Sequence, residues 1–231
     1  MVFRVKVCGI TRAEDAAAAA QAGADAVGLN FYPGSRRCVD WEQAVLIRRA
    51  CPEPLCVVGV YVNAPVDLVV RCAQQLPLHA VQLHGDEPPE YLRRLRARLP
   101  SGVGVIRAFR PRGALEPVLE YLRCCRARSV PLEMVLFDAP AARGAYGGTG
   151  TLGCWELAAE FAEMPGQPPL VLAGGLNPAN VADAVAVVAP AAVDTASGVE
   201  KAPGVKDAEK IRRFVQAAHR IWQRLQAEGG P

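Results

Sequence analysis

The sequence lacks the features that mark secreted, membrane-bound or metal-binding proteins. No apolar run approaches the roughly 18 residues of a membrane span, and Arg4 and Lys6 interrupt the short apolar N-terminus. We therefore expect no signal peptide and no membrane segment. There are only 3 histidines, and the 8 cysteines form no C-x-x-C pair. This pattern favours reduced thiols in a cytoplasmic protein over disulfides, and it predicts no metal site.

The sequence also has no strong excess of charge. Lys and Arg number 26 against 23 Asp and Glu, a net charge of +3 that predicts no nucleic-acid partner. Hydrophobic residues make up 51% of the chain and charged residues 21%, which is ordinary for a globular protein. No linker or change in composition divides residues 1–231, so the sequence predicts one domain of a length typical of a single α/β barrel.

Short β-branched apolar runs alternate with helix-like stretches along the whole chain. Runs of this kind are typical of parallel strands that are buried on both faces. Strands are expected at Val5–Cys8, Ala26–Phe31, Cys56–Tyr61, Ala80–Leu83, Val103–Ala108, Met134–Asp138, Leu170–Ala173 and Ala192–Thr195. Helices are expected at Ala13–Ala22, Trp41–Cys51, Pro65–Gln75, Pro88–Leu99, Leu115–Arg126, Cys154–Met164, Pro178–Val188 and Asp207–Glu228. Eight such units predict a single-domain (β/α)8 TIM barrel, with a doubly wound open sheet as the alternative.

Two reactive side chains stand at the ends of predicted strands. In a (β/α)8 barrel the active site lies at the C-terminal ends of the strands. Cys8 closes the first strand, and a modest lowering of its pKa would make it a base or nucleophile near neutral pH. Asp138 closes the sixth strand, where a carboxyl group needs a partner. The alternatives are a buried core cysteine and a helix-capping or ion-paired aspartate.

Glycines follow the last two predicted strands. Gly174-Gly175 and Ser197-Gly198 would let backbone N–H groups approach an anion, at the position where this fold recurrently binds phosphate. Tight turns alone are the alternative. A third stretch, Gly147–Gly150, formally fits G-x-G-x-x-G together with Gly153. It neither follows a strand directly nor precedes a suitably spaced acidic residue, so a loop that closes over substrate is favoured over a dinucleotide site.

Three further side chains are candidates for binding substrate. Arg36 and Arg37 follow the second predicted strand, where one guanidinium could hold a carboxylate through two hydrogen bonds. The alternative is a solvated pair. His84 closes the fourth strand and could polarise a substrate oxygen or hydrogen-bond to the rim of the barrel.

Taken in order, nine segments of the chain resemble the phosphoribosylanthranilate isomerase family of tryptophan biosynthesis. They run over nearly the whole length of the sequence. The segments are Lys6–Thr11, Ala22–Gly28, Phe31–Pro33, Val58–Asn63, Val81–Asp86, Gly147–Gly150, Leu172–Leu176, Ser197–Glu200 and Pro203–Asp207.

The resemblance implies a (β/α)8 barrel that needs no cofactor and acts on a small phosphosugar. The implied reaction is an Amadori rearrangement of N-(5-phosphoribosyl)anthranilate to the 1-deoxyribulose 5-phosphate derivative. It assigns the general base to Cys8 and the general acid to Asp138. It assigns the substrate carboxylate to Arg37, because the family usually has proline where Arg36 stands. The resemblance also implies that the phosphate binds to the backbone around Gly174, Gly175, Ser197 and Gly198.

These implied roles carry expectations about protonation. The acid must hold a proton at neutral pH, so we expect burial or nearby negative charge to raise the pKa of Asp138. Three departures from the family pattern are visible. Cys154 follows Gly153 where an aspartate is usual, Asn30 replaces an apolar residue, and Thr195-Ala196 stands where a serine-containing pair is common.

Other functions remain open at this stage. A different phosphate-binding barrel, such as a sugar-phosphate epimerase or a second sugar isomerase, would share the fold but not the combination of Cys8, Asp138 and Arg37. A catalytically silent barrel that binds a phosphorylated ligand or a protein partner is a non-enzymatic alternative. A chain of this size could be a monomer or a homodimer.

Overall fold

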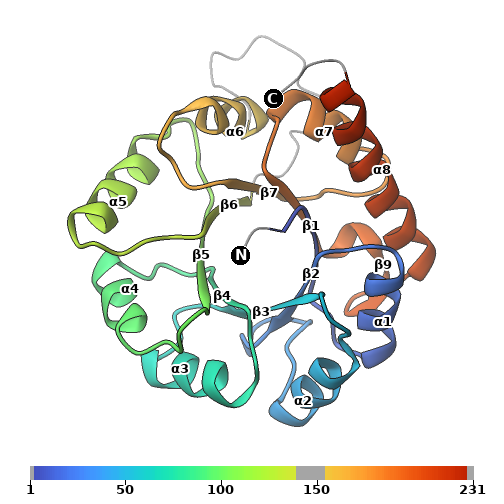
Figure 1. Cartoon of the computed structure of the whole chain (residues 1–231), viewed down its shortest axis with the longest axis horizontal. Coiled ribbons are helices and arrows are strands. Elements are labelled where there is room, and N and C mark those ends of the chain that lie inside the picture. The colour runs from blue at the N-terminus through green and yellow to red at the C-terminus, as the bar shows by residue number, and fades with distance from the viewer. Residues whose placement is uncertain (1–2, 139–153, 228–231) are drawn as a thin grey trace.

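The computed structural model describes residues 3–138 and 154–227 of the chain. Eight parallel strands in this part of the chain close into a barrel in the order β1 to β8 (Figure 1). The closure is visible in the pairing of the first and last strands, where Lys6 of β1 lies beside Asp194 of β8. The (β/α)8 barrel predicted from the alternating pattern is confirmed, and the open sheet is wrong.

The strands lie close to where the apolar runs predicted them. Their bounds are β1 (Val5–Cys8), β2 (Ala26–Asn30), β3 (Cys56–Tyr61), β4 (Ala80–Leu83), β5 (Gly104–Phe109), β6 (Met134–Asp138), β7 (Leu170–Ala173) and β8 (Ala192–Thr195). The helices surround the barrel (Figure 1). Their bounds are α1 (Ala13–Gln21), α2 (Trp41–Ala50), α3 (Val66–Gln75), α4 (Pro89–Arg96), α5 (Glu116–Ala127), α6 (Cys154–Glu163), α7 (Val181–Val188) and α8 (Ala208–Ala227).

Three segments differ most from the sequence prediction, the first being helix α4, which ends at Arg96 instead of Leu99. Helix α7 begins at Val181 instead of Pro178, because Asn177 and Asn180 form a turn in which the Asn177 N–H donates to Asn180 Oδ1 at 2.8 Å. Between β8 and α8 the chain forms a short helix, η1 (Ser197–Val199), and a two-stranded antiparallel sheet of β9 (Glu200–Ala202) and β10 (Val205–Lys206). The sequence reading did not anticipate this hairpin.

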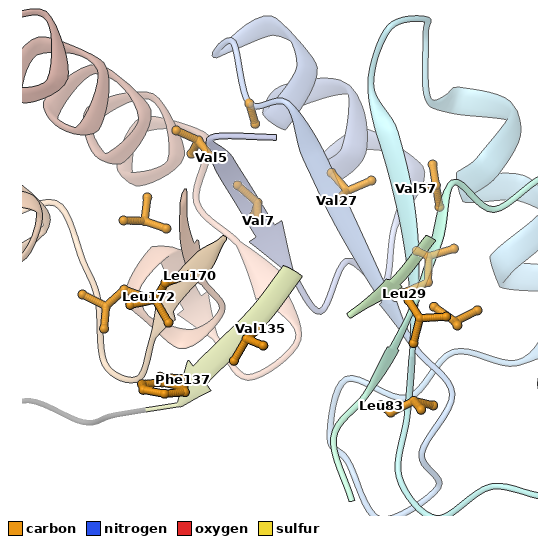
Figure 2. Packing of buried hydrophobic residues seen from close by; sticks show 14 of the residues in the cluster. Val5, Val7, Val27, Leu29, Val57, Leu83, Val135, Phe137, Leu170 and Leu172 are labelled. Atoms are coloured by element: carbon orange, nitrogen blue, oxygen red, sulfur yellow. The ribbon is translucent and has the colours of Figure 1, made fainter. Parts of the chain in front are cut away.

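Side chains alternate along each strand between the helices and the barrel interior, as the strand period of two requires. Outward residues such as Val7, Val27 and Leu29 form a layer against the helices (Figure 2). Inward apolar residues form a separate cluster inside the barrel: Phe3, Ala26, Val58, Ala80, Ile106, Ala108, Met134, Leu136, Val171, Ala173 and Ala192. This division explains why the strands read as continuous apolar runs, since both of their faces are buried.

Helix α8 shows how the helices cover the barrel. Its buried residues recur at helical spacing and form one apolar stripe: Ile211, Phe214, Val215, Ala218, Ile221 and Trp222. The opposite face is charged, so α8, the longest described helix, is amphipathic. None of the helices in the described ranges combines the length and apolar character needed to cross a membrane.

Candidate active site

A buried ion pair lies inside the barrel below the C-terminal rim. Lys6 Nζ is 2.7 Å from Asp194 Oδ2, and the Lys6 side chain is fully buried. Both residues face inward on adjacent strands, β1 and β8. Burial alone would lower the pKa of Lys6, but the carboxylate of Asp194 raises it, so the lysine stays charged. The sequence analysis included Lys6 only as part of a motif and did not predict this pair.

Cys8 lies on the same inward face as Lys6, two residues further along β1. Gly28 on the neighbouring strand leaves room for its sulfur, since a Cβ at that position would lie 2.7 Å from Cys8 Sγ. Burial raises the pKa of the Cys8 thiol above its ordinary value of 9.0, and the nearby ammonium of Lys6 only partly offsets this. The shift is thus opposite to the lowering considered from the sequence, and it favours the neutral thiol at pH 7.

Asp138 stands at the end of β6 with its carboxyl group partly exposed at the rim. Its Oδ2 atom is 3.3 Å from His84 Nε2 and 3.3 Å from Arg110 Nε. The hydrogen bond from His84 lowers the pKa of Asp138 below 3.8, against the effect of burial and with help from Arg110. The expected rise is thus wrong, because two donors stabilise the carboxylate.

His84 connects Asp138 to the barrel interior. Its Nδ1 atom is 3.0 Å from the amide nitrogen of Gln82, and its backbone N–H donates to the Tyr61 carbonyl at 2.8 Å. Both ring nitrogens of His84 are therefore in contact with protein groups. Of the two interpretations from sequence, the structure contains the hydrogen bond at the rim, and the contact with a substrate oxygen stays a prediction.

Arg37 lies in the loop after β2, where it forms an ion pair that the sequence did not reveal. Its Nε and Nη2 atoms each donate at 2.7 Å to a different carboxylate oxygen of Glu200, the first residue of β9. Gly9 is required beside it, because a Cβ there would overlap the Arg37 side chain. Arg36, by contrast, is exposed. The alternative of a solvated arginine pair is wrong for Arg37.

Asn30, one of the three departures, organises the same loop. Its Nδ2 atom donates to Ser35 Oγ at 3.2 Å, and its Oδ1 atom accepts from the Tyr32 N–H at 2.9 Å. Ser35 Oγ in turn accepts from the Arg37 N–H at 3.0 Å. A polar residue at the end of β2 therefore holds the turn that delivers Arg37 to the rim.

A second lysine completes the surroundings of Glu200. Lys206 Nζ donates to Glu200 Oε1 at 3.0 Å and to the Ala196 carbonyl at 2.8 Å, and its side chain is fully buried. Burial lowers the pKa of Lys206. Burial by itself would raise the pKa of Glu200, but the hydrogen bonds with the two cations Arg37 and Lys206 outweigh it and lower this pKa. The result is a cluster of one carboxylate between two cations beside the mouth of the barrel.

The glycine loops after β7 and β8 pack directly against each other. Gly174 and Gly175 have φ values of +95° and +69°, which favour glycine. A Cβ at Gly198 would overlap the carbonyl oxygen of Leu176, so the second loop needs glycine to approach the first. Thr195 Oγ1 also donates to Leu176 O at 2.7 Å. The departure at Thr195 thus joins the two loops through its hydroxyl.

The backbone of these loops has unused hydrogen-bonding capacity. The N–H groups of Gly174 and Gly175 donate to no atom of residues 3–138 or 154–227. Ser197 and Gly198 occupy the first turn of η1, where backbone N–H groups have no partner within the helix. Four N–H groups at one end of the barrel are therefore available to donate hydrogen bonds to an anion between the two loops.

One predicted element cannot be placed. The glycine stretch Gly147–Gly150, read as a closing loop, lies outside the described residues, as does Gly153. Helix α6 begins at Cys154, one of the three departures, and the residue before it, which would cap the helix, is also outside the described part of the chain.

The fold thus defines a (β/α)8-barrel enzyme with a thiol and a carboxyl at the C-terminal ends of its strands, where active sites of this fold lie. The family model described as N-(5'-phosphoribosyl)anthranilate (PRA) isomerase matches residues 5–217. The chain belongs to this family, as its ordered motifs predicted.

Individual relatives agree along nearly the whole chain. The N-(5'-phosphoribosyl)anthranilate isomerase of Myxococcus xanthus is 46% identical over 225 residues, covering 96% of this chain and 98% of the relative. The crystal structure of phosphoribosyl anthranilate isomerase from Thermotoga maritima matches with a TM-score of 0.76 at 41% identity, covering 95% and 99% of the two chains.

A second solved structure contains a ligand. It is a phosphoribosyl anthranilate isomerase in complex with reduced 1-(o-carboxyphenylamino)-1-deoxyribulose 5-phosphate. It is 39% identical to this chain with a TM-score of 0.75, and the alignment covers 95% of this chain and 99% of that one.

Proposed function

We propose that this chain converts N-(5'-phosphoribosyl)anthranilate to 1-(2-carboxyphenylamino)-1-deoxyribulose 5-phosphate in tryptophan biosynthesis. The observation that carries the proposal is the arrangement of the rim. In a member of this family, Cys8 and Asp138 end two strands of one barrel, and the glycine loops after β7 and β8 meet at the same end. An isomerase of this substrate needs an acid, a base and a phosphate site.

The chemistry divides between the two side chains. Asp138 gives a proton to the furanose ring oxygen, and the bond from this oxygen to C1 breaks as the amine nitrogen forms an iminium. Cys8 as thiolate then removes the proton from C2, and the C–H electron pair forms a C1–C2 double bond while the nitrogen regains its lone pair. The resulting enolamine takes a proton at C1 while its C2 hydroxyl releases one, so it becomes the ketone with no net change in protons. Groups of this kind typically accelerate such steps by about 10²–10⁴-fold.

The protonation state of the pair is the main demand of this mechanism. Burial raises the pKa of Cys8 and the hydrogen bond with His84 lowers the pKa of Asp138, which favours a thiol and a carboxylate. The reactive state is a thiolate and a carboxylic acid. Both states carry the same number of protons, so the site reaches its reactive form by redistributing one proton within the pair and not by net uptake.

Charged groups around the substrate favour this redistribution. Lys6 and Lys206 stabilise the thiolate form of Cys8. The substrate brings a phosphate and a carboxylate, and their negative charge favours the neutral acid form of Asp138. The hydrogen bond with His84 keeps Asp138 facing the barrel mouth, where the imidazole can also meet a substrate oxygen.

The two anionic ends of the substrate find separate positions on the rim. The phosphate is accepted by the backbone of Gly174, Gly175, Ser197 and Gly198. The anthranilate carboxylate is held by Arg37, whose Nη1 atom is not used in the pair with Glu200. Holding both ends fixes the sugar between acid and base, which is the larger part of the rate gain available to a site without a cofactor.

The remaining features of the proposal concern the setting of the enzyme. We propose that residues 1–231 act as one catalytic domain in the cytoplasm, with no cofactor and no nucleic-acid partner. The chain would work as a monomer or a homodimer. A solved Thermotoga maritima relative, 36% identical, is described as a dimeric enzyme from which monomers were generated.

The test is a fluorescence assay with purified protein, no added cofactor and a metal chelator present. We expect the fluorescence of N-(5'-phosphoribosyl)anthranilate to fall at a rate proportional to enzyme concentration. A double variant, Cys8→Ala with Asp138→Asn, serves as the matched control. If the wild-type chain binds the reduced product analogue but leaves the substrate unchanged, the silent-barrel alternative is correct and the proposal fails.

A further inference from the structure

The cluster of Arg37, Glu200 and Lys206, which we name the guanidinium cluster, has a feature that the mechanism above does not use. Glu200 binds the Nε and Nη2 edge of Arg37 with both of its oxygens, each at 2.7 Å. Paired in this way, the two planar groups share one plane, so the direction of the remaining Nη1 edge is fixed. That edge makes no hydrogen bond to the described residues.

Glu200 is held as firmly as the guanidinium it orients. Its residue is only 9% exposed, and its Oε1 atom also accepts from Lys206 Nζ at 3.0 Å. Its carbonyl oxygen accepts from Lys210 Nζ at 2.8 Å. Sequence-distant elements thus converge on one residue: the loop after β2 and strand β10 on its carboxylate, and helix α8 on its backbone carbonyl. A surface arginine pair would not need such support.

The charges of the guanidinium cluster leave a net charge of +1, from two cations and one carboxylate. Lys210, whose Nζ contacts the Glu200 carbonyl, adds positive charge beside the cluster, and the other charged neighbours are paired or neutral. Asp15 accepts from the Lys206 backbone N–H and pairs with Arg12, while the Cys8 thiol is neutral. The Glu200 carboxylate therefore orients Arg37 without cancelling its attraction for an anion, because Lys206 restores the lost charge.

We propose that Glu200 is a positioning residue that directs the Nη1 edge of Arg37 toward the aromatic carboxylate of the substrate, and that Lys206 preserves the positive charge of this subsite. This inference rests on the proposed function, which places an anthranilate group on Arg37. Orientation of the guanidinium and net charge of the cluster predict opposite effects of Glu200→Gln on the binding of a carboxylated ligand. Removing the charge of Glu200 raises the net charge of the cluster to +2, yet it releases the guanidinium from its plane.

The experiment compares two ligands that differ only in the carboxylate. One is reduced 1-(o-carboxyphenylamino)-1-deoxyribulose 5-phosphate, and the other is the same reduced amine made from aniline. Binding is measured by calorimetry, so that no turnover is needed. Glu200→Gln keeps the size of the side chain but sets an amide against the arginine donors. We expect it to weaken binding of the carboxylated ligand about tenfold, because an oriented charge-assisted hydrogen bond is lost, and to leave the aniline ligand unaffected.

Two further variants separate orientation from charge. Lys206→Met keeps the length of the buried side chain and lowers the net charge to zero, so we expect a smaller loss, about threefold, again for the carboxylated ligand only. Arg36→Ala is the matched control, since this exposed arginine has the same charge and lies next to Arg37. It should leave both affinities unchanged. In turnover assays Glu200→Gln should raise KM with little change in kcat, as expected for lost uniform binding.

Several outcomes would overturn the inference. Tighter binding of the carboxylated ligand by Glu200→Gln would show that charge alone governs the subsite. An equal loss for both ligands would show a purely structural role. Should Glu200→Gln fail to fold by circular dichroism, Arg37→Lys replaces it, since the lysine keeps the charge but loses the planar fork and should show the same ligand-selective loss.

The wild-type measurements separate the two proposals. If the wild-type chain binds both ligands equally but consumes N-(5'-phosphoribosyl)anthranilate, the carboxylate subsite on Arg37 and the inference about Glu200 fail while the proposed reaction stands. If the wild-type chain binds neither ligand and does not consume N-(5'-phosphoribosyl)anthranilate, the proposed function itself fails.

Discussion

The two ends of the barrel interior are built from the same strands but from opposite kinds of side chain. At the N-terminal end Phe3 packs with the first residues of alternate strands, Ala26, Ala80, Met134 and Ala192. At the C-terminal end the same inward face carries Cys8, His84 and Asp138. The first set can contribute only packing, whereas the second exposes titratable groups to a ligand. Stability and chemistry are thus assigned to different ends of each strand.

Strand β6 shows this division within five residues. Its inward positions are Met134, Leu136 and Asp138. The first two are fully buried apolar side chains, and the third is a partly exposed carboxylate. The buried pair of Lys6 and Asp194 marks the boundary between the two regions. Substitutions at the two ends should therefore have separable effects, and the following predictions test that separation.

The largest effect on stability is expected at the N-terminal end. Phe3 is 2% exposed, and Phe3→Ala should lower the free energy of unfolding by about 3–5 kcal/mol, because it removes transfer free energy and leaves a cavity. The kcat of the folded fraction should stay near that of the wild type. Urea denaturation measures the first quantity and turnover at low temperature the second. A loss of kcat comparable to the loss of stability would contradict the division.

The opposite pattern is expected at the C-terminal end. Cys8→Ala and Asp138→Asn should each lower turnover at least about a hundredfold, equivalent to about 2.7 kcal/mol in activation free energy. Their denaturation midpoints should change little, because neither side chain fills the apolar interior. Steady-state kinetics and denaturation on the same preparations provide the comparison. Near-normal turnover in either variant refutes the role assigned to that residue.

The pH dependence tests the inverted protonation of the pair. The hydrogen bond with His84 holds the pKa of Asp138 below its ordinary value of 3.8, and burial holds the pKa of Cys8 above its ordinary value of 9.0. Between these values the total number of protons on the pair is constant, so the reactive fraction does not depend on pH. We expect kcat/KM to be flat from about pH 7 to about pH 9 and to fall above that range, as Cys8 ionises and the pair loses the shared proton. A rise or fall of kcat/KM within this pH range would contradict the pKa shifts of Asp138 and Cys8.

The smallest effect is expected on the outer surface. Asp67 forms an exposed ion pair with Arg98 between α3 and the residues after α4. Exposed pairs contribute little, because solvent screens them and two long side chains must be ordered. Asp67→Asn should leave both the denaturation midpoint and kcat/KM within experimental error, even though it breaks a visible contact. A clear change in either would show that surface charge matters more than the comparison of the two ends implies.

The sequence predicted what depends on local pattern. The strands were predictable because burial on both faces gives apolar runs, and Cys8 and Asp138 stood out because each interrupts such a run at its end. The protonation of these two groups was not predictable in the same way. It depends on His84 and Arg110, which lie 54 and 28 residues from Asp138 in the sequence, and on how deeply the Cys8 sulfur is buried.

The partner of Arg37 could not be found from sequence for a similar reason. Glu200 lies 163 residues away and reaches Arg37 only through the hairpin of β9 and β10, whose strands are three and two residues long. Such short strands have no usable periodicity. The repeated charged residues from Glu200 to Lys210 were the one available signal, and they gave no indication of which cation would pair with Glu200.

The most direct test of the central claim is a crystal structure of this chain with reduced 1-(o-carboxyphenylamino)-1-deoxyribulose 5-phosphate. The account predicts that the phosphate accepts hydrogen bonds from backbone N–H groups of the two glycine loops, that Arg37 contacts the carboxylate, and that Cys8 and Asp138 lie on opposite sides of the first carbons of the sugar chain. A ligand whose phosphate lies away from both loops, or whose reacting carbons contact neither Cys8 nor Asp138, would contradict it.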